Sequence, residues 1–198
     1  MSEAPSEDCA WVTIPAPFGA DELRQWLEDP ETLFRINSLL EIGQWIRQGE
    51  RQARCVGRNL SNDRELELAM TLDPGQQGLL ITYTGGLKRS TTFTVEPGDT
   101  TTSQLRITDD YSGLSEDERK ARVGEVDRSL PQWGRDLHKY FHAWKRWSWF
   151  PPWRWYMTHL WLKMKPTARR ITRWIWWLTL AEIVAFALVF GVLLIEQR

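Results

Sequence analysis

Cysteine and histidine are scarce in this 198-residue chain, which has two cysteines, Cys9 and Cys55, and three histidines. Two cysteines are too few for the disulfide framework of a small secreted domain, and they fit a reducing compartment. The N-terminus lacks the basic and apolar stretches of a signal peptide, so we expect no cleaved leader. The sequence also contains no nucleophile motif, phosphate-binding loop or paired metal-ligand spacing. It therefore carries no catalytic signature.

Tryptophan, in contrast, is abundant, and nine of the 13 tryptophans lie between Trp144 and Trp177. Tryptophan prefers the membrane–water interface, because its ring is apolar and its N–H needs a polar partner. An apolar run follows at residues 174–195, and as a helix it would be about 33 Å long, against a hydrocarbon core of about 30 Å. Its Leu, Ile, Val and Phe residues contribute about −6 kcal/mol to insertion, whereas Glu182 costs about 3 kcal/mol. We predict one transmembrane helix at residues 174–195.

The charges divide the chain into an acidic and a basic part. Residues 1–134 carry a net charge of −9, and residues 135–173 carry +9. The positive-inside rule then predicts a single-pass protein with its N-terminal domain in the cytosol, in the inner membrane if the chain is bacterial. An acidic domain repels nucleic acid, so we expect no nucleic-acid partner.

Residues 148–173 combine tryptophans with basic side chains, a pattern typical of a segment lying on a membrane surface. We expect this segment to contact membrane lipid. The residues predicted at the interface, including the start of the apolar helix, are Trp149, Trp153, Trp155, Trp161, Lys163, Lys165, Arg169, Arg170, Arg173, Trp174, Trp176 and Trp177.

Glu182 is the one charged residue within the apolar run. A carboxylate inside a membrane is usually functional or partnered. The small-residue pairs Ala181/Ala185 and Ala187/Gly191 would permit close packing of helices. Two interpretations stay open: Glu182 pairs with a polar group of another membrane protein or a second copy of this chain, or it is a protonated, neutral glutamate that costs some stability.

The preceding part of the sequence predicts a strand, two short helices, six strands and a long helix. The predicted strands are residues 9–14, 42–48, 51–58, 65–72, 78–84, 90–95 and 101–109, the predicted short helices are residues 20–27 and 31–40, and turns are predicted at residues 73–75, 85–86 and 96–99. Pro15 is expected to stop the first strand. Ser115 and Glu118 form a capping box that predicts a helix start, and Pro131 is expected to kink or restart that helix.

The predicted strands alternate between apolar and polar residues, which indicates an antiparallel meander with one buried face. The long helix presents an aromatic face at helical spacing that includes Trp133, Leu137 and Phe141. This face is the available cover for the apolar side of the sheet.

This order of elements resembles the START-like superfamily, also called SRPBCC, over residues 9–147. The first strand and its proline-marked turn read WVTIPAP (residues 11–17), the first helix ends in WLEDPE (residues 26–31), and the closing helix begins LPQW (residues 130–133). The resemblance implies an α+β helix-grip fold, in which a curved antiparallel sheet wraps a long C-terminal helix, here followed by the interfacial segment and one transmembrane helix. Residues 1–8 are expected to be disordered.

The resemblance also implies an apolar cavity of the kind that holds lipids, sterols, quinones or polyketides. Combined with the apolar faces, it predicts that the cavity is lined by Leu68, Met70, Ile81, Tyr83, Phe93, Leu105, Ile107, Trp133, Leu137 and Phe141.

Other polar residues receive weaker functional interpretations. His138 and His142 have a spacing that can bind zinc, but no third ligand accompanies them, and we predict no metal and no cofactor. Asp109, Asp110 and Tyr111 could offer an acid pair at a cavity mouth, although we favour a polar turn. Tyr83 and Arg106 could present a polar group to a ligand, and for Tyr83 a core position with a satisfied hydroxyl is favoured. His159 fits a lipid headgroup contact.

Three functions are consistent with these features. The favoured one is a membrane-tethered module that binds or transfers an apolar small molecule at the cytosolic face. The alternative is a non-catalytic accessory subunit that docks into a membrane complex through its transmembrane helix, since a fold does not fix a function. A cyclase- or aromatase-like enzyme comes third, because only the resemblance supports it, so we favour a protein that is not an enzyme.

Overall fold

The computed structural model describes residues 9–85, 88–113 and 129–196. Residues 1–8 and the helix predicted to begin at Ser115, with its capping partner Glu118, lie outside this part of the chain. The chain divides into two compact units, the first ending at Lys163 and the second beginning at Met164.

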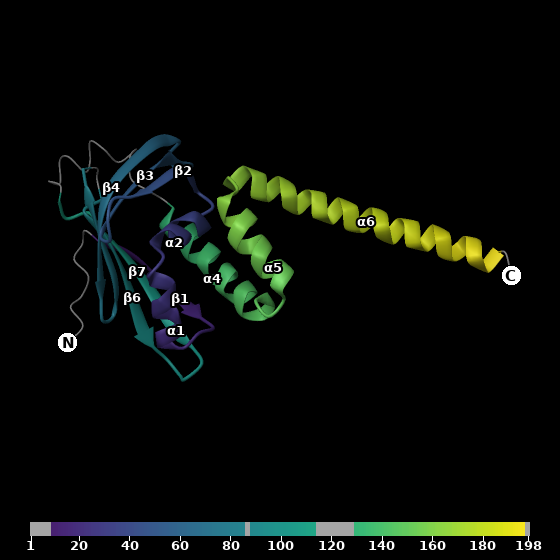
Figure 1. Cartoon of the computed structure of the whole chain (residues 1–198), viewed down its shortest axis with the longest axis horizontal. Helices are drawn as coiled ribbons and strands as arrows, with labels where there is room; N and C mark the ends of the chain where they lie inside the picture. Colours follow the sequence, from purple (N-terminus) through teal and green to yellow (C-terminus); the bar gives the residue numbers. More distant parts are fainter. Residues whose placement is uncertain (1–8, 86–87, 114–128, 197–198) are drawn as a thin grey trace. The chain divides into compact units, whose positions relative to one another are not determined.

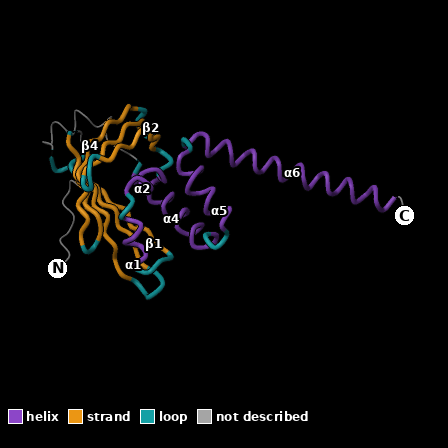
Figure 2. The backbone as a smooth tube through the Cα atoms, viewed as in Figure 1, coloured by secondary structure: helices purple, strands orange, loops and turns teal. Residues whose placement is uncertain are grey.

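The first unit contains a curved sheet (Figure 2). The sheet has seven antiparallel strands in the order β1-β7-β6-β5-β4-β3-β2. Its strands are β1 (Cys9–Ala16), β2 (Leu40–Arg47), β3 (Gln52–Asn59), β4 (Arg64–Gly75), β5 (Gly78–Thr84), β6 (Ser90–Pro97) and β7 (Ser103–Asp110). Strands β2 to β7 are neighbours in both sequence and space, and β1 closes the order by pairing with β7.

Helices α1 (Ala20–Leu27), α2 (Pro30–Ile36) and α4 (Leu130–Trp147) lie on one face of this sheet (Figure 1). The α2 helix begins where Asp29 accepts hydrogen bonds from the Thr32 amide at 3.3 Å and hydroxyl at 2.7 Å, with Pro30 in the first turn. This is an N-cap with proline at the position that lacks an intrahelical partner. Together the sheet and the long α4 helix confirm the predicted helix-grip architecture.

The α4 helix packs closely on the edge strand β1. A Cβ atom added at Gly134 would lie 2.9 Å from a Val12 methyl group and 3.3 Å from an Ile14 methyl group. Glycine therefore lets the helix axis approach the strand. Helix α4 begins at Leu130 with Pro131 in its first turn, and whether this proline restarts or kinks a preceding helix depends on residues outside the described part of the chain.

Several element boundaries differ from the sequence-based expectations, and three of these differences are informative. Strand β1 continues through Pro15, which an edge strand tolerates because the missing N–H can face away from the ladder. Helix α2 ends at Ile36 rather than residue 40, because Asn37 is extended and its Oδ1 accepts from the Leu39 amide at 3.0 Å. Strand β4 runs through the expected turn at residues 73–75.

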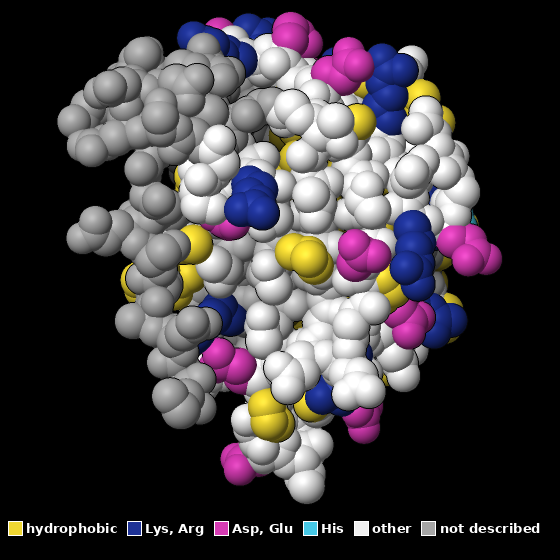
Figure 3. Space-filling view, turned by 90° about the vertical axis from the view of Figure 1, so that its left-hand side faces the viewer, with side chains coloured by type: hydrophobic (Ala, Val, Ile, Leu, Met, Phe, Trp, Pro, Cys, Tyr) yellow, Lys and Arg dark blue, Asp and Glu magenta, His cyan; other side chains and the backbone are white. Residues whose placement is uncertain are grey.

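The hydrophobic core lies between the sheet and the three helices, and its largest fully buried side chains include Phe18, Phe93, Phe141, Ile81 and Leu137. The opposite face of the sheet is polar. Figure 3, seen from the sheet side, shows mostly non-hydrophobic surface with basic and acidic side chains interspersed. The predicted sheet, with one apolar face and one solvent-exposed polar face, is thus present.

After α4 the first unit continues through α5 (Pro151–Trp155), a π-helical turn η2 (Tyr156–Leu160) and a 3₁₀ turn η3 (Trp161–Lys163). Met157 and Leu162 are buried in this segment. The compact unit therefore extends past residue 147, where the sequence pattern predicted its end.

The second unit consists mainly of α6 (Pro166–Glu196), a helix of 31 residues. The most apolar stretch within residues 166–190 has a mean hydropathy of 1.6, and none of it is buried. By length and composition this helix could cross a membrane. The predicted apolar helix is present, and it begins before residue 174.

Cys55 gives a first testable prediction. It is fully buried in β3, and burial raises the pKa of its thiol to about 12, an effect that the positive charge of Arg35 only partly offsets. The thiolate is the reactive form, so we expect iodoacetamide to leave Cys55 unmodified in the folded protein and to modify it in urea. Raising the pH from about 8 to about 9.5 should not change this, because the folded-state thiol keeps its proton until about pH 12.

Peptide mapping by mass spectrometry measures this result, with the half-buried Cys9 as an internal comparison. Native modification of Cys55 that rises tenfold per pH unit across this range would contradict its burial.

Candidate ligand-binding pocket

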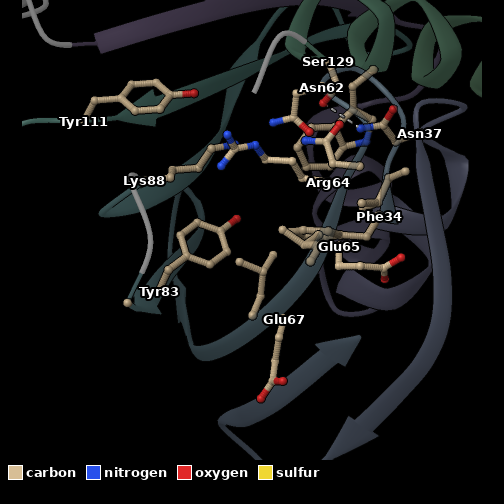
Figure 4. A pocket seen from close by; sticks show the side chains of 16 residues that line it. Phe34, Asn37, Asn62, Arg64, Glu65, Glu67, Tyr83, Lys88, Tyr111 and Ser129 are labelled. Carbon is tan, nitrogen blue, oxygen red and sulfur yellow. Dashed lines mark hydrogen bonds between the residues drawn. The ribbon is translucent and has the colours of Figure 1, made fainter. Parts of the chain in front are cut away.

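A pocket of about 270 Å³ opens at one end of the core, between the sheet and the start of α4. Figure 4 shows the side chains around it. It is lined by Phe34, Asn37, Leu40, Asn59, Asn62, Arg64, Glu65, Leu66, Glu67, Leu68, Tyr83, Gly85, Lys88, Tyr111, Ser129 and Trp133.

Aromatic rings from α2 and α4 form the apolar wall of this pocket. The Phe34 and Trp133 rings meet edge to face with centroids 5.0 Å apart, a favourable arrangement for aromatic pairs. The indole N–H of Trp133 donates to the Leu33 carbonyl at 2.8 Å. This hydrogen bond holds the Trp133 ring in its orientation against Phe34.

Polar contacts hold the corner after α2 against the first turn of α4. The amide of Asn37 donates to the Ser129 hydroxyl at 3.1 Å, and both residues are buried. The Ser38 backbone amide donates to the Asp136 carboxylate at 2.9 Å. These side chains satisfy one another, as buried polar groups require, and they keep the pocket walls together.

A chain of polar groups runs along the sheet beside the pocket. The Tyr83 hydroxyl donates to the Thr91 hydroxyl at 2.9 Å, and the Thr91 hydroxyl donates to the Asp109 carboxylate at 2.6 Å. The Lys88 ammonium lies 2.7 Å from the other carboxylate oxygen of Asp109. The Asp109 side chain is 1 % exposed and that of Lys88 16 % exposed. The ion pair is therefore largely shielded from water.

The strand registers explain why these groups meet. Thr91 pairs with Ile81 on one side and with Asp109 on the other. Side chains alternate between faces along a strand, so Tyr83 follows Ile81 on the inner face, and Asp109 follows Ile107. The apolar rows of β5 and β7 thus each end in a polar residue at the pocket.

Arg64 adds a second cation to the pocket lining. Arg64 lies two and four residues before Leu66 and Leu68 on β4, so its side chain is on the same, inner face of the strand. Glu65 and Glu67 are exposed and lie on the opposite face. In Figure 4 the Arg64 side chain extends toward the side of the pocket where Lys88 lies, and the two carboxylates point away from it.

The ten residues predicted to line a cavity divide into two groups. Leu68, Tyr83 and Trp133 line the pocket. The others are buried in the adjoining core: Met70, Ile81, Phe93, Leu105, Ile107, Leu137 and Phe141. Their side chains fill space that an open cavity would occupy, and a ligand contact for any of the ten stays a prediction.

Sequence reasoning missed the contribution of Asp109 and Lys88. The favoured polar turn is wrong for Asp109, which is the last but one residue of β7 and fully buried. Extending the alternation of Leu105 and Ile107 by two residues would have placed it on the inner face. Tyr111, just beyond this strand, lines the pocket.

The remaining polar candidates lie elsewhere. The ring centroids of His138 and His142 are 4.3 Å apart, and Nδ1 of His138 lies 3.1 Å from the Pro15 carbonyl oxygen. No group of three His, Cys, Asp or Glu side chains suited to a metal occurs among the described residues. Arg106 forms an ion pair with Glu96 at 3.2 Å, and the His159 ring stacks on Trp155.

The four tryptophans of the first unit that were predicted to lie at a membrane interface differ in exposure. Trp153 and Trp161 pack against the core, where their rings approach those of Trp144 at 5.8 Å and Tyr140 at 5.6 Å. Trp149 and Trp155 are 74 % and 55 % exposed. Trp153 and Trp161 are thus half-buried, and a membrane contact for any of these four tryptophans stays a prediction.

Comparison with known proteins defines the class of fold. No protein-family model matches the sequence, and no curated protein matches it. Among solved structures, a START superfamily protein from Mycobacterium smegmatis covers 68 % of this chain and 97 % of its own length, with 14 % identity and a TM-score of 0.50.

Two enzymes share the same fold. A norcoclaurine synthase point mutant from Thalictrum flavum matches 69 % of this chain and 95 % of its own, with 11 % identity and a TM-score of 0.54. The ZhuI aromatase/cyclase from a Streptomyces species matches 71 % and 96 %, with 14 % identity and a TM-score of 0.54. The START-like fold predicted from the sequence is thereby confirmed. Identities this low establish the fold and leave the activity open.

Proposed function

We propose that the first unit binds a compact apolar molecule in the pocket beside Trp133, and that α6 tethers this unit to the cytosolic face of a membrane. The observation that carries the proposal is a pre-formed pocket with an aromatic and aliphatic wall and a few polar groups. Such pockets are typical of small-molecule sites. The similarity to START-like proteins supports the same interpretation through the fold.

The size of the pocket narrows the ligand class. Pockets for drug-sized molecules usually have volumes of about 300–1,000 Å³, and this one has about 270 Å³. A lipid with two acyl chains would need the space that core side chains such as Phe93 and Ile107 fill completely. We therefore favour a molecule of one or two rings, or one short chain.

The tether would raise the encounter rate with an apolar ligand dissolved in the bilayer, because linkage converts binding into a local event at high effective concentration. The length and apolar composition of α6 support it, as does the basic segment before it, which fits anionic headgroups. Exposed Trp149 and Trp155 are suited to the interface.

Filling the pocket tests the proposal. We expect the Leu68→Trp variant to lose at least tenfold in affinity for the neutral probe phenylnaphthylamine, because the larger side chain would occupy the space beside Tyr83. Native mass spectrometry of the full-length protein, released from detergent, counts bound probe without counting probe dissolved in micelles. Leu80→Trp is the matched control, since Leu80 is exposed on the other face of β5.

Two outcomes would contradict the proposal: no binding of the probe to the wild-type protein, or equal binding to both tryptophan variants. Either would favour the alternative in which the protein docks into a membrane complex through α6 and Glu182. The similarity to an aromatase/cyclase concerns the fold, so no cyclisation reaction is proposed.

A further inference from the structure

We infer that the ligand of this pocket is an organic anion, with a carboxylate, sulfonate or phosphate group bound by Lys88 and Arg64 and an apolar body against Trp133. This inference rests on the proposed function and specifies its ligand class.

The first support is the fixed position of the Lys88 ammonium. Asp109 holds it at 2.7 Å from within the sheet, and the ammonium lies 6.0 Å from the centre of the Tyr83 ring. A lysine side chain is normally mobile and loses conformational entropy when it binds a ligand. Because Asp109 already restrains Lys88, less of this entropy is lost on binding. Lys88 is thus a pre-positioned cation at the pocket wall.

The second support is the direction of the hydrogen bonds around Asp109. Thr91 donates to one oxygen of the carboxylate and Lys88 approaches the other, while Tyr83 donates to Thr91. The contacts of the carboxylate are charge-assisted, and such hydrogen bonds are stronger than neutral ones. Asp109 therefore acts as a positioning residue that holds the Lys88 ammonium in place.

The third support is the arrangement of charge around the pocket. Lys88 and Arg64 carry positive charges in the lining, and the buried Asp109 beside the pocket carries a negative charge that pairs with Lys88. The nearby Glu65 and Glu67 lie on the alternate, exposed face of β4, and Glu67 is paired with Arg54. The four charged lining residues are thus two cations and two carboxylates, and the two cations lie on the same side of the pocket (Figure 4), which favours an acidic ligand group at that side.

The chemistry of the two cations fits an oxyanion. Arginine can bind a carboxylate or phosphate with two parallel hydrogen bonds, and lysine contributes a compact charge. The apolar side of the pocket, built from Phe34, Trp133 and Leu66, would contact the rest of the molecule. The expected ligand is therefore amphipathic, with its acidic group at the β4–β5 side.

The test compares two probes with one skeleton: anilinonaphthalene sulfonate and its neutral parent, phenylnaphthylamine, which lacks the sulfonate. Native mass spectrometry of the full-length protein measures the occupancy of both probes over a titration. In Arg64→Met, and in the charge-balanced double variant Lys88→Met/Asp109→Asn, we expect the sulfonate probe to bind about tenfold more weakly than to wild type. The neutral probe should bind within twofold of wild type.

Arg106→Met is the matched control, because Arg106 lies on the outer face of β7 and is paired with Glu96. It should change the binding of neither probe. The double variant avoids an unpaired buried charge, and Arg64→Met removes an exposed side chain, so both variants should fold.

Equal loss of both probes in these variants, or unchanged binding of the sulfonate, would overturn the inference while leaving the pocket as a binding site. Failure of the wild-type protein to bind either probe would instead contradict the proposed function itself.

Discussion

Replacement of Lys88 by methionine is expected to destabilise the protein by about 3 kcal/mol, because Asp109 would remain in the core without a counter-charge. Removing one partner of a buried ion pair typically costs about 3–5 kcal/mol, and we expect the lower end because Lys88 borders the pocket and retains 16 % side-chain exposure. For a chain of this size, a loss of about 3 kcal/mol corresponds to a fall in Tm of about 6–12 °C. Thermal unfolding followed by tryptophan fluorescence measures it.

The double variant Lys88→Met/Asp109→Asn is the decisive comparison. Asparagine keeps an oxygen that can accept from Thr91, and both charges are gone, so most of the lost stability should return. Coupling between the two positions follows from their contact, since contacting residues are usually non-additive. Additive effects of Lys88→Met and Asp109→Asn would contradict the ion pair described at the pocket wall.

Two arginines in the middle of α6 are expected to move the protein from the membrane to the soluble or aggregated fraction. Val184 and Leu188 lie one turn apart, and both are exposed in this helix. An arginine near the centre of a span costs about 2.5–3.5 kcal/mol. Two of them would therefore offset the insertion energy of about −6 kcal/mol that the apolar residues contribute. Carbonate extraction followed by immunoblotting measures the distribution.

The control variant Val184→Ala/Leu188→Ala removes the same two side chains without adding charge. Alanine is tolerated in a span, so this variant should stay in the membrane pellet. A Val184→Arg/Leu188→Arg protein that resists carbonate extraction as wild type does would rule out α6 as the anchor.

The sequence predicted the order of elements well because the periodicities are local. The alternation of Leu79, Ile81 and Tyr83 identifies β5 with its observed bounds, and the spacing of Leu23 and Leu27 identifies α1. The end of β1 was missed because a proline is read as a strand breaker, whereas the edge position that tolerates Pro15 depends on the tertiary arrangement.

The pocket was harder to predict, because its location depends on which core positions leave space. Phe93, Phe141 and Tyr83 all face the interior of the fold. The rings of Phe93 and Phe141 are completely buried, and they occupy space that the sequence pattern had assigned to a cavity. The partnership of Lys88 with Asp109 joins residues 21 positions apart through the pairing of β6 and β7, and no local pattern encodes it. Trp153 and Trp161 illustrate the same limit, since composition could not separate core rings from exposed ones.

The edges of the sheet have a consequence for how neighbouring molecules would interact in the proposed membrane-tethered state. In the described chain, β1 and β2 each pair on one side only, and an unpaired edge can recruit a strand from a neighbouring molecule. Pro15 gives β1 a residue without an N–H, and the β2–β3 register shifts between Ile42 and Gln44, which interrupts the regular ladder. In the tethered state that we propose, confinement to a bilayer would raise the frequency of collisions between molecules, and these two interruptions would disfavour pairing between their sheet edges.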